Sequence, residues 1–342
     1  MEMRESRVAG CLYGLALGDA LGAPTEFLPV GEILRRWPPG GPLEPAGDPA
    51  RVTDDTQMAL AVGEALAGAI RARDFSPATL EALLREAFVG WANSPENNRA
   101  PGMTCLRACE GLEAGRGWLE ATVKDSKGCG ANMRVAAVGL LDPEAHGVGE
   151  VGRAAIAQFQ AALTHGHATA LAASDLTAYA VARLATGTQP SSLPEALKVY
   201  ASSQREVYHH AWLGELWQRP GVGSPEEFIE RGWDECLAVL GRLDAALAAP
   251  DYEADPCLAT GEGWVAEEAL ATGLLCFLLY PDEPVKALRR AAVTSGDSDS
   301  IACLAGAFAG AFWGADCWPR EWVRRIEYRE RLARLAGELS RN

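Results

Sequence analysis

Basic segments, long apolar runs and alternating strand patterns are all scarce in this sequence. Acidic residues outnumber basic ones by 46 to 31, which gives a formal net charge of −15, and no basic arm or patch interrupts that excess. Because phosphate backbones repel such a surface, we expect no general nucleic-acid binding. The two most apolar runs, 301–315 and 269–280, are shorter than the roughly 20 residues that span a bilayer, so we also expect no membrane partner.

Several familiar catalytic and metal-binding motifs are absent as well. The chain has no CxxC pair, no HExxH, no GxSxG elbow and no GxxxxGK[ST] phosphate loop, and it has only five histidines. Its nine cysteines are odd in number, and several stand in apolar segments with helical spacing, which is typical of reduced, buried thiols. The beginning MEMRESRVAG lacks the apolar stretch of a secretory signal. We therefore predict a cytoplasmic protein, and we expect a monomer.

Helical periodicity dominates what is present. Residues 7–22 carry Val8, Cys11, Leu12 and Leu15 on one face of a helix. The same spacing predicts helices over 54–72, 78–91, 103–113, 150–163, 168–185, 193–202, 225–246, 265–279, 284–292, 300–315 and 320–339. Clusters of proline and glycine separate them, the longest of which is PPGGPLEPAGDP at 38–49. With no internal repeat and no long linker, the sequence predicts an all-α fold and a single domain over residues 1–342.

The stretch TSGDSDSIACLAGAFAGAFWGAD, residues 294–316, joins acidic residues to a helix of small residues. Gly306, Gly310 and Gly314 recur every fourth position, so they share one face and allow a neighbouring backbone to approach closely. Each glycine costs about 1 kcal/mol relative to alanine in an exposed helix, and close packing at the protein centre would offset that cost. We therefore expect the N-terminus of this helix to lie deep in the fold.

Two clusters of aspartate and hydroxyl residues each precede a predicted helix. They are Thr53-Asp54-Asp55-Thr56 and Asp297-Ser298-Asp299-Ser300. Capping is the ordinary interpretation of one such cluster, since Ser, Thr and Asp are preferred N-caps and acids suit the first turn. The alternative is a site for a hard cation such as Mg²⁺, Mn²⁺ or Ca²⁺, which prefer oxygen ligands. If the two clusters meet, their carboxylates need cations between them, and a pair of divalent ions is a known solution.

Two further segments carry weaker signals of function. GLALGDALGAPTEF, residues 14–27, ends its helix at Gly22-Ala23-Pro24 and places Glu26 on the following loop; an ordinary helix stop explains this equally well. In DSKGCGANMRVAAVG, residues 125–139, the glycine-rich turn is predicted to open a helix whose first turn holds Asn132 and Met133. Such a turn can bind phosphate through backbone N–H groups, although a flexible surface turn would look the same.

Taken together, these motifs resemble one family. GCLYGLALGDALGAPTEF, TDDTQMAL, KGCGANMRVAAVG, THGHATA and SGDSDSIACLAGAFAG occur in the order found in the ADP-ribosylglycohydrolases, the family of dinitrogenase reductase-activating glycohydrolase and the ARH hydrolases. They extend over residues 8 to 318, and CWPREWVRRIEYRERLARLA is similar to the last helix of the family. The resemblance implies a compact all-α fold with a central cleft that binds two divalent cations, Mg²⁺ or Mn²⁺.

The resemblance also implies roles for individual residues. The metal ligands would be Thr53, Asp54, Asp55, Asp297, Asp299 and Ser300. Many family members have threonine where this chain has Ser300, which keeps the hydroxyl. Asp55 would activate a water, and Glu26 would gate the site or act as an acid. The substrate would be contacted by Gly102, Thr104, Ser126, Lys127, Gly128, Cys129, Gly130, Asn132, Met133 and His165.

The implied reaction is hydrolysis of the glycosidic bond that joins ADP-ribose to a modified target, linked through arginine or serine. Two alternatives remain open at this point. One is a hydrolase of an ADP-ribosylated nucleobase or a small ADP-ribose derivative, whose metal site would look the same. The other is a relative that binds ADP-ribose without catalysis. Because every ligand position holds an oxygen-bearing residue, the sequence favours the enzyme.

Overall fold

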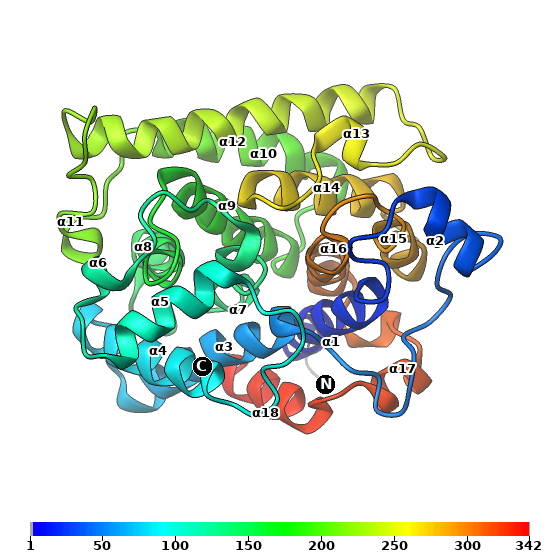
Figure 1. Cartoon of the computed structure of the whole chain (residues 1–342), viewed down its shortest axis with the longest axis horizontal. Coiled ribbons are helices and arrows are strands. Elements are labelled where there is room, and N and C mark those ends of the chain that lie inside the picture. Colours follow the sequence, from blue (N-terminus) through cyan, green and yellow to red (C-terminus); the bar gives the residue numbers. More distant parts are fainter. Residues whose placement is uncertain (1–2, 342) are drawn as a thin grey trace.

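The chain folds into helices joined by turns and loops (Figure 1), in a computed structural model that describes residues 3–341. The longer helices are α1 (Met3–Gly22), α3 (Asp54–Ala72), α4 (Pro77–Ala92), α5 (Met103–Glu113), α8 (Gly149–Ala162), α9 (Ala168–Ala185), α10 (Leu193–Gln204), α12 (Pro225–Ala248), α14 (Ala266–Leu279), α15 (Pro284–Ala291), α16 (Ser298–Trp313) and α18 (Arg329–Leu339). The shorter ones are α2 (Val30–Arg36), α6 (Trp118–Ala121), α7 (Ala136–Gly139), α11 (His210–Leu213), α13 (Cys257–Thr260) and α17 (Arg320–Arg325). Between residues 3 and 341 the only β-pairing is in isolated bridges, so the all-α prediction is confirmed.

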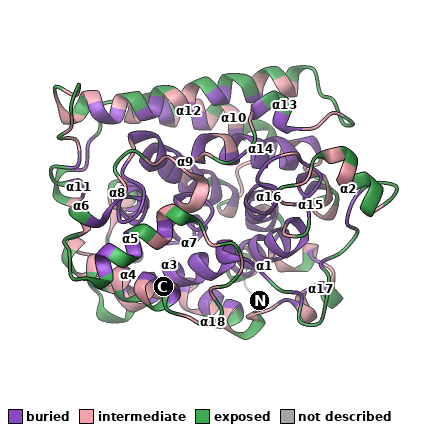
Figure 2. Ribbon diagram, viewed as in Figure 1, coloured by how far each residue is buried: buried purple, intermediate pink, exposed green. Residues whose placement is uncertain are grey.

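Helices α1 and α16 pack against each other at the centre of the molecule (Figure 2). Each carries small residues at every fourth position on the face that meets the other. A Cβ atom added to Gly14 would lie 2.1 Å from the carbonyl oxygen of Gly306, and one added to Gly306 would lie 2.0 Å from that of Gly14. Gly10 and Gly310 make the same reciprocal approach. Only glycine permits this backbone contact, which places the N-terminus of α16 in the interior, as the sequence predicted.

Amphipathic helices surround this central pair. Helix α12 runs along one edge of the molecule, and α17 and α18 lie along the opposite edge (Figure 1). Ser224 starts α12 by accepting a hydrogen bond from the backbone N–H of Glu227, and the helix buries Phe228, Trp233 and Leu240 while its other face is exposed. One cluster of buried side chains extends from Val8 to Leu339, so segments from the whole chain contribute to a shared core.

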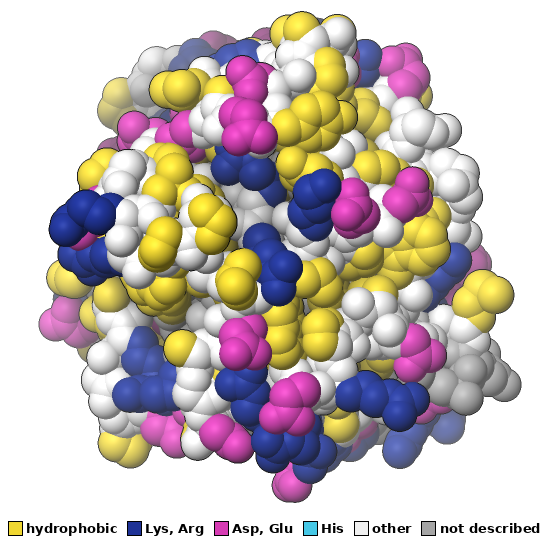
Figure 3. Space-filling model, turned by 90° about the vertical axis from the view of Figure 1, so that its right-hand side faces the viewer, with side chains coloured by type: hydrophobic (Ala, Val, Ile, Leu, Met, Phe, Trp, Pro, Cys, Tyr) yellow, Lys and Arg dark blue, Asp and Glu magenta, His cyan; other side chains and the backbone are white. Residues whose placement is uncertain are grey.

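The surface mixes charges of both signs. Figure 3 shows the face that carries α2, α15 and α17, where Lys and Arg side chains are interspersed with Asp, Glu and apolar ones. None of the helices between residues 3 and 341 combines the length and the apolar character that a membrane span requires. All nine cysteines are free thiols, and most of them are buried, as predicted.

The last predicted helix, 320–339, is wrong as a single element. It is divided into α17 and α18 by an extended residue, Ile326, and by Tyr328, which has a left-handed φ of 56°. The backbone at the break is held by the segment around Ala50, which donates its N–H to the carbonyl of Arg325 and accepts from the N–H of Glu327. These tertiary hydrogen bonds replace the helical ones.

The glycine-rich turn at 125–139 also differs from the prediction. Instead of opening one helix, it forms a single 3₁₀ turn at Cys129–Ala131 and a chain of tight turns before the short α7. The N–H of Cys129 donates to the carbonyl of Trp264, and the side-chain amide of Asn132 donates to that of Ala266. These contacts hold the segment against the start of α14. The sequence analysis predicted no element over 30–36, where the structure has α2.

Candidate active site

The two aspartate clusters, which are far apart in the sequence, come together at the centre of the molecule. Thr53 caps α3, accepting a hydrogen bond from the N–H of Asp55 at 3.3 Å. The hydroxyl of Ser300, in the first turn of α16, donates to the Oδ1 atom of Asp55 at 2.9 Å. The N-termini of α3 and α16 therefore face each other. Their partial positive charges favour carboxylates at this place.

A third acid from the N-terminal loop completes the group. Oxygen atoms of Glu26, Asp297 and Asp299 all lie within 4.8 Å of one another. Both aspartates are buried and Glu26 is half-buried. Within the described part of the chain, no lysine or arginine forms an ion pair with any of the three. Such a cluster of oxygens can hold a hard divalent cation.

Capping explains part of the second cluster but not all of it. Asp297 occupies the N-cap position of α16, yet its side chain makes no capping hydrogen bond. Its Oδ2 atom instead accepts from the thiol of Cys129 at 2.8 Å. Asp299 does bond locally, through Oδ1 to the N–H of Ser300 at 3.0 Å. The carboxylate of Asp297 is therefore directed into the site, which favours a role as a ligand.

Electrostatic repulsion is strong in this cluster. Burial, and next the charge of Asp299, raise the pKa of Asp54 to about 7. Burial, followed by the charges of Asp299 and Asp297, raises the pKa of Glu26 to about 10. For Asp55 and Asp297, burial and next the charge of Asp299 raise the pKa well above its ordinary value. In the metal-free protein these carboxyls favour the protonated form, whereas exposed carboxyls near neutral pH are ionised. A bound divalent cation would favour the ionised form instead.

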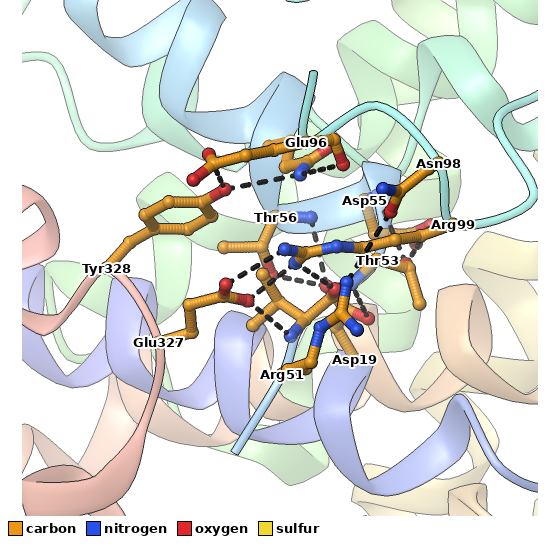
Figure 4. Close-up of polar contacts among 12 residues, drawn as sticks. Asp19, Arg51, Thr53, Asp55, Thr56, Glu96, Asn98, Arg99, Glu327 and Tyr328 are labelled. Atoms are coloured by element: carbon orange, nitrogen blue, oxygen red, sulfur yellow. Dashed lines mark hydrogen bonds and ion pairs between the residues drawn. The ribbon is translucent and has the colours of Figure 1, made fainter. Parts of the chain in front are cut away.

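Asp19 is a site residue that sequence reasoning did not assign. It is fully buried near the end of α1, and its carboxylate accepts hydrogen bonds from the backbone N–H groups of Thr53 and Thr56 and from the hydroxyl of Thr56 (Figure 4). Burial, and next the charge of Asp299, raise the pKa of Asp19 to about 7. The carboxylate therefore sets the position of Thr53. The sequence signal that could have identified Asp19 is its position as an acid on the apolar face of a helix, within GDALGAPTEF.

An ion pair fixes the chain just before Thr53. Arg99 forms a two-pronged pair with Glu327, with N–O distances of 2.5 and 2.9 Å (Figure 4). Arg99 also donates to the carbonyl of Val52 at 2.7 Å, and Glu327 accepts from the Val52 N–H at 3.1 Å. Both charged side chains are largely buried, at 10% and 14% exposure. This contact ties the break between α17 and α18 to the residue next to the site.

Two of the segments predicted to contact the substrate, around Thr104 and around Ser126, lie side by side. The hydroxyl oxygens of Thr104 and Ser126 are 3.0 Å apart. The N–H of Gly102 donates to the Oδ2 atom of Asp54 at 3.2 Å, so this turn also touches the acidic cluster. The structure therefore brings the predicted substrate turns next to the predicted metal ligands.

The side chains of Lys127 and Cys129 point in different directions from this loop. The ammonium of Lys127 pairs with Glu235 at 2.6 Å and with the buried Glu267 at 2.5 Å, away from the acidic cluster. The thiol of Cys129 points the other way, with its sulfur 2.8 Å from Asp297 and 3.6 Å from the Ser300 hydroxyl. Cys129 thus contacts the predicted metal ligands directly, which sequence reasoning did not anticipate.

The remaining predicted substrate residues lie behind the loop. His165 is 2% exposed, and a Cβ atom added to Gly128 or Gly130 would lie 3.3 or 3.4 Å from its Nε2 atom. Burial lowers the pKa of His165 to about 3, so the ring is neutral. Asn132 and Met133 are also buried. In the structure these three side chains support the loop from the interior, and their contact with a substrate stays a prediction.

Comparison with known proteins places this geometry in context. The family profile described as ADP-ribosylglycohydrolase matches residues 1–342. ADP-ribosylhydrolase ARH3 of Gallus gallus is 27% identical and covers 98% of this chain and 92% of its own. ADP-ribosylarginine hydrolase Tri1 of Pseudomonas putida is 27% identical over 99% of this chain and 79% of its own. A solved structure titled "ADP-ribosylglycohydrolase-related protein complex" superposes with a TM-score of 0.68 at 25% identity, covering 99% of each chain.

Proposed function

Because the chain belongs to the ADP-ribosylglycohydrolase family, we propose that it hydrolyses the glycosidic bond that links ADP-ribose to an arginine or serine of a modified protein. The observation that carries the proposal is the meeting of the two aspartate clusters, through the hydrogen bond from Ser300 to Asp55. Family membership alone would also suit a relative that has lost its site. In this chain every predicted ligand position holds an oxygen-bearing residue and the two clusters are in contact, which supports the enzyme.

We infer that the acidic cluster holds two divalent cations, since its many oxygens lie close together and no basic side chain in the described chain pairs with Glu26, Asp297 or Asp299. Their ligands would be Thr53, Asp54, Asp55, Asp297, Asp299 and Ser300. This donor set consists of oxygen atoms, which suit Mg²⁺ and Mn²⁺ equally. The raised pKa values of Asp54 and Asp55 mark a group of carboxyls that cannot all ionise without added positive charge. When bound, the cations would supply Lewis-acid chemistry and lower the pKa of a coordinated water.

The residues of the chain would orient the substrate and move the protons. Asp55 stands between Thr53 and Ser300, with one carboxylate oxygen near each hydroxyl, and is assigned as the base for the attacking water. Glu26 reaches the cluster from a loop that is half-exposed, so it is assigned to gating or to protonation of the leaving group. Asp19 acts as a positioning residue, because it holds Thr53 and Thr56 rather than the substrate.

The adjoining turns would bind the diphosphate. Ser126 and Thr104 present hydroxyls at one place, and Gly128 and Gly130 lie next to them, with an added Cβ atom at either glycine within 3.4 Å of the His165 ring. Backbone N–H groups and hydroxyls bind phosphate oxygens without requiring a lysine or an arginine. This arrangement suits an acidic protein, since the anion would be recognised by local dipoles rather than by net charge.

The identity of the leaving group is tested with a separate substrate for each linkage. Tri1 is titled an ADP-ribosylarginine hydrolase and ARH3 an ADP-ribosylhydrolase, and the two are equally distant from this chain. We would measure release of ADP-ribose by the purified protein from arginine-linked, serine-linked and base-linked substrates. Each would be run with Mg²⁺, with Mn²⁺ and with a chelator. Metal-dependent release from one protein-linked substrate supports the proposal.

Matched variants separate a true site from contamination. Asp299→Asn removes one negative charge from the cluster and should lower release by about 100-fold or more, since loss of even an outer partner of a metal costs 10- to 100-fold. Asp282→Asn, a change of the same type at an exposed position, should leave the rate unchanged. Release from the base-linked substrate alone would replace the proposal with the nucleobase alternative. No release, with ADP-ribose still bound in calorimetry, would replace it with a binding module.

A further inference from the structure

A cavity lies at the opposite end of α1 from the acidic cluster. It has a volume of about 540 Å³ and is enclosed by α1, the segment that follows α7, and helices α8, α9 and α10. Arg4 and Val8 line it, whereas Asp19 belongs to the acidic cluster. At a rise of about 1.5 Å per residue, Arg4 and Asp19 are roughly 20 Å apart along the helix. The cavity is therefore separate from the site described above.

A buried arginine forms the floor of this cavity. Arg153 is 2% exposed, and its guanidinium donates to the carbonyl of Ala178 at 3.3 Å and to the carboxylate of Glu150. Its Nε atom has no hydrogen-bond partner among residues 3–341. Glu150 is mostly in solvent, with 63% of its side chain exposed. A buried guanidinium with an open donor and a solvent-exposed counter-ion can accept an anion in place of that counter-ion.

Two more cations and an aromatic pair stand around the same cavity. Arg183 is exposed, and within the described part of the chain it forms no ion pair; its guanidinium lies 6.0 Å from the ring centroid of Tyr179. Arg153 lies 5.5 Å from the same ring, and Tyr200 stacks on Tyr179 with ring centroids 3.8 Å apart. Arg4 is 3.8 Å from its nearest carboxylate, that of Asp142. In a chain with a net charge of −15, this concentration of guanidinium groups is local.

Besides these groups the cavity is lined by the carboxylates of Asp142 and Glu150, by Thr186, and by apolar residues that include Val8, Leu140, Leu141, Pro143, Ala182 and Ala185. A cavity of this size with apolar walls and a few placed charges is typical of a small-molecule site. We propose that it binds a small organic anion, with a carboxylate, sulfonate or phosphate group at the guanidinium groups of Arg153 and Arg183 and an apolar or aromatic body against the walls. The site does not depend on the hydrolase activity.

The test uses 8-anilinonaphthalene-1-sulfonate, an aromatic anion whose fluorescence rises on binding, and N-phenyl-1-naphthylamine, which lacks the sulfonate. Both would be titrated into the full-length protein and into three variants. Ala182→Phe fills the cavity from its half-exposed side, and Arg183→Gln removes the free charge. Arg320→Gln removes a comparable exposed arginine from α17 as the control. Melting temperatures establish that each variant is folded.

We expect one tight sulfonate site that Ala182→Phe abolishes. Arg183→Gln should weaken it by roughly three- to fivefold, the loss of one partly exposed charge interaction, and Arg320→Gln should not change it. The uncharged probe should bind about tenfold more weakly than the sulfonate. Equal binding of both probes would overturn the anion assignment. Sulfonate binding that is the same in Ala182→Phe and Arg183→Gln as in the parent protein would overturn the site itself.

Discussion

Replacing Gly306 by alanine tests the central helix contact directly, because the structure predicts an effect opposite in sign to the ordinary one. In an exposed helix this change stabilises by about 1 kcal/mol. Here the added Cβ atom would lie 2.0 Å from the carbonyl oxygen of Gly14, whereas ordinary contacts begin near 3.4 Å. The obstacle is backbone, so no side chain can rotate away. The two helices must separate by more than about 1 Å, since packed interiors have no spare room.

The magnitude follows from known costs of overpacking. An extra methyl group in a packed core costs about 1–3 kcal/mol, and a backbone obstacle belongs at the upper end of that range. After the gain in helix propensity, the net loss is about 2 kcal/mol. A chain of 342 residues has an unfolding entropy of about 0.7 kcal/mol/K, so the melting temperature should fall by about 3 °C.

Gly241 is the matched control. It lies in the middle of α12 at an exposed position, and a Cβ atom added there meets nothing within 4 Å. Gly241→Ala should therefore raise the melting temperature by about 1 °C. Both variants would be melted in a calorimeter with a chelator present, so that metal binding does not contribute. If Gly306→Ala is as stable as the parent protein, or more stable, the close packing of α1 and α16 described above is wrong.

Three further predictions concern the acidic site. Asp19→Asn should weaken Mg²⁺ binding, measured by calorimetry, by about 10- to 100-fold, because the carboxylate that accepts from the Thr53 N–H is lost. Helicity measured by circular dichroism should stay unchanged. An unaltered Mg²⁺ affinity would exclude the positioning role. In the folded, metal-free protein the pKa values of Asp54 and Asp19 are raised to about 7. Their protonated forms therefore stabilise the folded state at low pH, and that stabilisation is lost as the pH rises toward 7. The increase in melting temperature caused by Mg²⁺ should thus grow between pH 5 and pH 8, on the order of a few degrees; a constant increase would contradict this. Cys129→Ser should retain metal-dependent activity, measured as the rate with Mg²⁺ and with a chelator, because a serine hydroxyl can still donate to Asp297; loss of that activity would contradict this.

The features that the sequence predicts well are those that depend on local pattern. The bounds of α3, α5 and α9 follow from apolar spacing and from capping residues such as Thr53, and they agree with the structure to within about a residue, which is better than the usual uncertainty of helix ends. The choice of the two aspartate clusters rests on residue type and on the family resemblance. Their meeting is a tertiary fact, and no spacing along the chain could establish it.

The features that were missed depend on distant partners. Glycine spacing in α16 indicates a close contact, but only the structure shows that the partner is the similar row in α1. The break at Ile326–Tyr328 arises from hydrogen bonds to Ala50, so the helical pattern of 320–339 conceals it. Asp19 resembles an ordinary end-of-helix acid until Thr53 and Thr56 are placed beside it.

The contact between α1 and α16 also bears on how the protein is made. Helix α1 leaves the ribosome long before the helix that covers its glycine face, which begins only at Ser298. At a synthesis rate of roughly 5–20 residues per second, the apolar side chains of α1 wait for tens of seconds without their partner. The nascent chain therefore exposes the buried face of α1 until α16 has been made. Chaperones that hold early segments would act on α1, and the acidic site can form only after α16 has been added.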